Sequence, residues 1–118
     1  MKFAALIVAM LLAAGVAGEA AAHAVVIGTS LAAEPIAAGH ATHVLMRFNS
    51  GIEIGLSRAF LVSKGDHFQQ LTIARGEKPG ELLVDVPALV PGDYALKFRI
   101  LAADGHVTED VLRFQVKP

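Results

Sequence analysis

The segment "DYALKFRIL" (Asp93–Leu101) decides the fold class, because large apolar side chains recur at every second position from Tyr94 to Ile100. Every second position is apolar and would share one face of an extended chain: Tyr94, Leu96, Phe98 and Ile100. Lys97 and Arg99 fall on the opposite face. A period of two predicts a β-strand with one face in a core and the other in water.

Other segments on either side of this strand are also predicted to be strands, and turn residues separate them. They are Val25–Ile27, 40–49, 57–65, 69–76, 81–89 and 110–117. Val44, Met46 and Phe48 share one face of the second strand, and 82, 84 and 86 share one face of another. About seven short strands with turns at this spacing predict an all-β antiparallel sandwich in a single domain. The phenylalanines after the apolar start of the chain mostly fall at positions expected to be buried.

Two connections help to define the sandwich. "SLAAEPIAAG" (30–39) is rich in alanine, but Pro35 and Gly39 would break a helix, so we expect a connection between the first two strands. Pro91 and Gly92 make a turn ahead of Tyr94. The Tyr94 hydroxyl could tie this corner to nearby backbone, as in Greek-key sandwiches, or the ring could simply pack in the core.

The first residues, "MKFAALIVAMLLAAGVAGEAAAHA", have the order of a secretory signal peptide. A basic Lys2 is followed by an apolar run and then by small residues that end at Ala22. We expect residues 1–22 to be cleaved, leaving an exported domain of residues 23–118 with no membrane insertion. The net charge of −1 gives no indication of nucleic-acid binding, and the absence of Cys excludes disulfides and thiolate chemistry.

Cleavage after Ala22 would make His23 the first residue of the exported chain. Its α-amine and imidazole could then close one chelate ring on a metal ion, since both lose their protons near neutral pH. Two such nitrogens suit Cu(II), which favours nitrogen donors in a tetragonal plane. The alternative is a chance histidine at a frayed terminus.

A second candidate lies in "AADGHVTED", between the last two predicted strands. Asp104 and His106 flank Gly105, which allows a tight turn that could bring a carboxylate and an imidazole to one point. With His23 they would complete a four-donor copper plane. Asp-Gly is also a common hairpin dipeptide, so the local sequence taken alone favours an ordinary turn with an exposed His106.

Together these features resemble the CopC family of copper-binding proteins over essentially all of residues 23–118. The matching stretches are "HAVVIGTS", "AAEPIAAGH", "LMRFNSGIE", "LVPGDYALKFRILAADGH" and "RFQVKP". The resemblance implies a Greek-key β-barrel or sandwich, similar to cupredoxins. It also implies one Cu(II) per chain, bound by the amine and imidazole of His23 with Asp104 and His106. The implied role is capture, buffering or delivery of periplasmic copper in resistance or homeostasis, by a monomer that could serve a CopD-type inner-membrane transporter.

The chain departs from some CopC proteins in one region. Where those carry a methionine-rich loop, this chain has "KGDHFQQLTIARGEKPGE", without Met. Met46 is expected in the core, so we predict no separate Cu(I) site, since Cu(I) prefers sulfur. Glu53 is the nearest equivalent of a glutamate found near the copper in some members, and its role stays open. The remaining histidines are expected to be solvent-exposed rather than ligands: His40, His43 and His67.

No enzyme motif is present: the chain has no Gly-x-Ser-x-Gly elbow, no His-Glu-x-x-His pair and no glycine-rich phosphate loop. We therefore expect no catalysis. The alternative function from a different class is a metal-free Ig-like β-sandwich that acts in adhesion or assembly.

Overall fold

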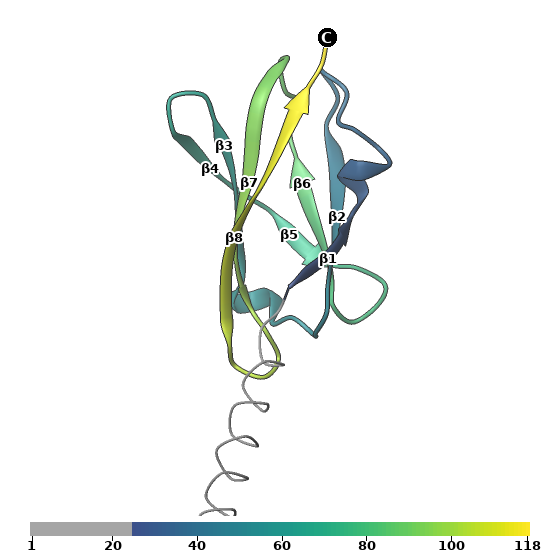
Figure 1. Cartoon of the computed structure of the whole chain (residues 1–118), viewed down its shortest axis with the longest axis vertical. Coiled ribbons are helices and arrows are strands. Elements are labelled where there is room, and N and C mark those ends of the chain that lie inside the picture. Colours follow the sequence, from purple (N-terminus) through teal and green to yellow (C-terminus); the bar gives the residue numbers. More distant parts are fainter. Residues whose placement is uncertain (1–24) are drawn as a thin grey trace, which may run out of the picture.

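The 93–101 stretch forms most of β7 (Gly92–Leu101), a central strand in one of two four-stranded antiparallel sheets (Figure 1). The structure is a computed structural model that describes residues 25–118. One sheet has the order β1-β2-β6-β5 and the other β4-β3-β7-β8. The remaining strands are β1 (Val26–Thr29), β2 (Thr42–Phe48), β3 (Arg58–Ser63), β4 (His67–Leu71), β5 (Ile73–Arg75), β6 (Glu81–Val86) and β8 (Val107–Val116). The predicted all-β antiparallel sandwich is confirmed.

The described residues contain eight strands rather than about seven. The stretch 69–76, which we expected to be one strand, divides at Thr72 into β4 and β5, and these belong to different sheets. The chain stays extended while its pairing partner changes from β3 to β6. Alternation of apolar and polar residues shows only that the backbone is extended. It therefore cannot show where the chain passes from one sheet to the other.

The core lies between the sheets and is built from the alternating faces that the sequence predicted. Met46 and Leu82 are fully buried, and so are Leu96 and Ile100. Phe48 of β2 and Phe98 of β7 meet edge to face across the two sheets, with ring centroids 5.8 Å apart. The expectation for phenylalanines holds only in part, because Phe68 on the edge strand β4 is 56% exposed.

The alanine-rich 30–39 stretch is a connection, as predicted. It contains one short 3-10 turn, η1 (Ser30–Ala32), and Ile36 anchors it in the core. A second short 3-10 turn, η2 (Ile54–Leu56), lies between β2 and β3. Within residues 25–118, no helix has the length and apolar character needed to cross a bilayer.

Tyr94 forms the predicted corner, and its ring packs against the margin of the core. Its hydroxyl donates a hydrogen bond to the carbonyl of Val90 at 2.8 Å, which closes the corner ahead of β7. Its half-buried ring stacks on Phe114 of β8, with centroids 5.8 Å apart. The corner and the ring stack fix the start of β7 against the end of β8.

Candidate functional site

The turn between β7 and β8 brings Asp104 and His106 together. The backbone N–H of His106 donates to Asp104 Oδ1 at 3.0 Å, and His106 Nδ1 lies 3.3 Å from the same oxygen. Gly105 adopts a φ of +92°, a left-handed conformation that favours glycine. Two backbone hydrogen bonds of Ala102 close the turn. Its carbonyl accepts the Gly105 N–H and its N–H donates to the His106 carbonyl, both at 2.9 Å. The predicted convergence of a carboxylate and an imidazole is therefore present.

Both side chains are accessible to a solute ion, with about half of each exposed: 44% for Asp104 and 50% for His106. The N–H donated by the His106 backbone lowers the pKa of Asp104 below its usual value, and the nearby imidazole adds to this effect. Asp104 is thus an ionised oxygen donor at neutral pH. A carboxylate and an imidazole are ligands for divalent transition metals such as copper and zinc.

The beginning of the described chain lies at the same end of the sandwich as this turn (Figure 1). Val25 and Asn49 exchange two hydrogen bonds, from Val25 N–H to the Asn49 side chain at 2.8 Å and from Asn49 N–H to the Val25 carbonyl at 3.1 Å. A little further along, the Gly51 carbonyl accepts the N–H of Ala103 at 2.9 Å. One loop therefore contacts both the start of β1 and the residue next to Asp104. His23, the third predicted site residue, lies outside the described residues.

Glu53 lies in this same loop, and its backbone N–H donates to the Leu101 carbonyl at 2.9 Å. Its backbone therefore supports the end of β7. Within residues 25–118, no group of three or more His, Cys, Asp or Glu side chains is arranged to hold a metal ion. The structure accordingly does not bring Glu53 into such a group with Asp104 and His106.

The other histidines are exposed, as predicted: His40, His43 and His67. One partner was not predicted: His43 Nε2 lies 2.7 Å from Asp85 Oδ1 on the neighbouring strand. These residues face each other in the β2–β6 register. Only knowledge of the strand pairing could have revealed this contact.

Met46 is fully buried between the sheets, as expected from its place in the alternation of β2. It is the one methionine in the part of the chain that the structure describes. A thioether with no exposed surface cannot reach a solute metal ion unless the core opens. The prediction that Met46 belongs to the core is confirmed.

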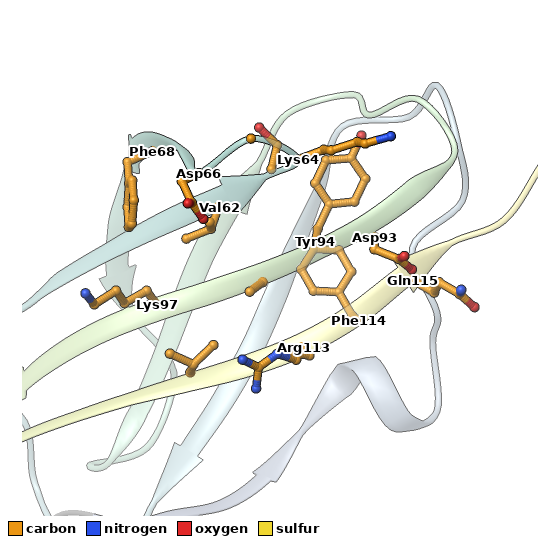
Figure 2. Close-up of a pocket in the computed structure, with 14 residues that line it drawn as sticks. Val62, Lys64, Asp66, Phe68, Asp93, Tyr94, Lys97, Arg113, Phe114 and Gln115 are labelled. Carbon is orange, nitrogen blue, oxygen red and sulfur yellow. The ribbon is translucent and has the colours of Figure 1, made fainter.

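A hollow of about 760 Å³ lies on the face of the β4-β3-β7-β8 sheet that points away from the core. Figure 2 shows Phe68, Val62, Lys97 and Arg113 around it, and the Lys97 ammonium lies 5.5 Å from the centre of the Phe68 ring. The hollow reaches towards the β3–β4 turn and the end of β8. Its lining does not include Asp104 or His106.

Two antiparallel sheets with an accessible carboxylate–imidazole turn at one end define a β-sandwich domain with a candidate metal-binding end. The CopC domain model matches residues 26–117. The chain belongs to the CopC family.

Solved structures share this fold. CopC from Methylosinus trichosporium OB3b is 31% identical, with a TM-score of 0.69 over 81% of this chain and 95% of that one. PcoC from Escherichia coli, described as a methionine-rich copper resistance protein, has a TM-score of 0.62 at 20% identity, covering 81% of this chain and 100% of that one. At that identity PcoC supports the fold alone.

Protein YobA of Escherichia coli K12 is a curated relative, 31% identical over 78 residues, and YobA of Shigella flexneri matches equally. The match covers 63% of this chain and 62% of the relative's length.

Proposed function

We propose that the protein binds one Cu(II) ion through the α-amine and imidazole of His23, together with Asp104 and His106. The observation that carries this proposal is the β7–β8 turn, which holds a carboxylate and an imidazole together at the end of the sandwich where β1 begins. The match to the CopC domain model supports copper as the metal, because the sequence resembles the copper-binding proteins of that family.

The attachment of Val25 limits how far His23 could lie from the end of the sandwich that carries Asp104. His23 precedes Val25 by two residues, and two extended residues reach at most about 7 Å. Val25 is fixed to Asn49, and Gly51 in the same loop is fixed to Ala103. If cleavage makes His23 the first residue, its amine would therefore start from the end of the sandwich that carries Asp104.

The donor set suits Cu(II) better than Cu(I). It comprises three nitrogens and one carboxylate oxygen, which match the tetragonal preference of Cu(II), whereas Cu(I) prefers sulfur. In the metal-free protein His106 Nδ1 lies 3.3 Å from Asp104 Oδ1, so a bound copper ion would replace this direct contact between its two ligands.

The proposed role is to capture, buffer or deliver periplasmic copper, with copper as cargo and without catalytic turnover. Cleavage after Ala22 would accompany export, and that same cleavage would create the amine donor on His23. A CopD-type inner-membrane transporter is the proposed recipient by family resemblance. Detoxification and supply both fit this chemistry.

Electron paramagnetic resonance of the mature protein with one equivalent of Cu(II) tests the proposal. We expect a nitrogen-rich type 2 spectrum that changes when Met is added before His23 and when His106 is replaced in His106→Ala, with weaker binding in both. His67→Ala is the matched control, because His67 is exposed at the β3–β4 turn and should leave the spectrum unchanged. Full affinity in both site variants would refute the ligand set and favour the metal-free adhesion or assembly module. Mass spectrometry of the secreted chain checks that His23 is its first residue.

A further inference from the structure

Strand β8 (Val107–Val116) is the longest edge strand of the described structure. It pairs with β7 from Val107 to Val116 in one continuous register, and it ends the order of its sheet. The other edge strands are much shorter, with four residues in β1, five in β4 and three in β5. Figure 1 shows β8, in yellow, running along most of the sandwich. A long edge with unpaired backbone groups is a template for another strand.

The outward side chains of β8 match those of a second, antiparallel β8 strand in charge and polarity. In order they are Val107, Glu109, Val111, Arg113 and Gln115. If a second copy paired antiparallel about Val111, Glu109 of each copy would face Arg113 of the other. The two Val111 side chains, each 39% exposed, would cover one another at the centre. Opposite charges across antiparallel strands stabilise the pair, and the two-fold symmetry repeats each contact.

The backbone supports the same register. The N–H of Val111 donates to the carboxylate of Asp110 at 2.8 Å, so it is directed away from β7 and towards the open edge. In an antiparallel strand the residues whose N–H and C=O groups face one side alternate. Glu109, Val111 and Arg113 therefore present their backbone groups at the open edge. These are the residues whose side chains match.

We propose that β8 pairs with β8 of a second copy of this chain, antiparallel and centred on Val111, to join two four-stranded sheets into one of eight strands. Glu109 already lies 3.3 Å from Arg99 of its own chain, so pairing would place its carboxylate between two guanidinium groups. Arg113 makes no ion pair among the described residues and would gain one. The proposed dimer differs from the monomer expected above.

Asp110 opposes this pairing. Its carboxylate occupies the Val111 N–H that the second copy would need, and its side chain would face Leu112 of that copy. A charged group at an edge is a known way to limit strand addition. Asp110 therefore makes the proposed dimer weak, so that it forms only at high protein concentration. Removal of the Asp110 carboxylate should strengthen it.

The dimer does not rest on the proposed copper function. Because the strands run antiparallel, the two Asp104–His106 turns lie at opposite ends of the joined β8 pair. Copper removal should leave the dimer intact, and a variant that fails to dimerise should still bind copper. The two proposals can thus fail separately.

Sedimentation velocity of the purified mature protein over a wide concentration range tests the dimer. We expect reversible monomer–dimer exchange, weakened roughly tenfold or more by Arg113→Glu, which places like charges opposite each other twice. The double variant E109R/R113E should restore association, and Asp110→Ala should tighten it. Lys64→Glu, a matched charge reversal in the β3–β4 turn, should have no effect.

A wild-type protein that stays monomeric at every concentration would overturn the proposal. Association that R113E leaves unchanged, or that E109R/R113E does not restore, would overturn it as well and would indicate a different interface. Circular dichroism establishes that each variant is folded. Val111→Lys at the centre provides a second disruptive variant, with a loss of association as the expected result.

Discussion

The hydroxyl of Ser57 accepts a hydrogen bond from the backbone N–H of Leu101 at 3.1 Å, although the two residues are 44 positions apart. The same hydroxyl donates to the carbonyl of Glu53 at 2.8 Å. Ser57 is fully buried. Its side chain therefore joins the loop that contains Gly51 and Glu53 to the end of β7, just before the turn that carries Asp104 and His106.

Ser57→Ala should lower stability and weaken copper binding. The change leaves the Leu101 N–H and the Glu53 carbonyl without their buried partner, which costs about 1–3 kcal/mol of unfolding free energy. Urea denaturation and a competitive Cu(II) titration measure the two effects. Ser63→Ala, in the same strand region but with no side-chain hydrogen bond among the described residues, is the control. Equal stability of Ser57→Ala and the parent would show that the hydroxyl does not join these segments.

Gly80→Ala should destabilise the same end of the sandwich. Gly80 has a φ of +83°, and a Cβ added there would lie 2.8 Å from the Phe48 carbonyl oxygen and 2.9 Å from that of Ser50. Backbone atoms cannot move aside as a flexible side chain would, and the left-handed conformation adds about 1–2 kcal/mol of its own. A thermal melt should show a clearly lower Tm. Gly55→Ala, where no atom lies within 4 Å of the added Cβ, should melt close to the parent.

Met46→Leu should leave any Cu(I) binding unchanged, because Met46 is fully buried. The volume-conserving replacement should cost less than about 1.5 kcal/mol of stability. Met46→Ala should cost about 2–5 kcal/mol by leaving a cavity between the sheets. Competition with a Cu(I)-specific chelator and urea denaturation provide the two measurements. Loss of Cu(I) binding in Met46→Leu would show that this thioether is a ligand.

Acid should disrupt the β7–β8 turn of the metal-free protein only at low pH. The backbone N–H of His106 lowers the pKa of Asp104 in the folded protein. The ionised carboxylate therefore stabilises the folded state fully at pH values above the pKa of the unfolded chain, which is about 3.9. That contribution is lost as the pH falls through the lower folded pKa. Titration of the Asp104 carboxyl carbon by NMR should therefore give a midpoint below the ordinary value. A midpoint at or above about 3.9 would contradict the observed hydrogen bond.

Copper should leave at a higher pH than the one that disrupts the turn. The α-amine and the imidazoles have reference pKa values of about 7.7–8.0 and 6.5, so protons displace copper from them first. We expect the Cu(II) affinity to fall steeply below about pH 5 while the turn stays intact. Retention of full affinity at pH 4 would exclude the proposed nitrogen donors.

Several features could be predicted from the sequence because they depend on neighbours along the chain. The alternation from Tyr94 to Ile100 gave the buried face of β7, and Gly105 between Asp104 and His106 gave the tight turn. The division of 69–76 between two sheets could not be predicted, since an extended chain looks the same whichever strand it pairs with. The exposure of Phe68 was missed for a related reason, because edge position depends on strand order.

The sequence by itself determined which residues are extended, which faces are apolar, and that a carboxylate and an imidazole share one turn. These properties follow from local periodicity and backbone conformation. Only the tertiary structure decided that Val25 and Ala103 contact one loop, that Ser57 joins Glu53 to Leu101, and that β8 ends its sheet. Each depends on strand pairing between distant segments, which is selected by packing of the whole core and not by any single stretch of the chain.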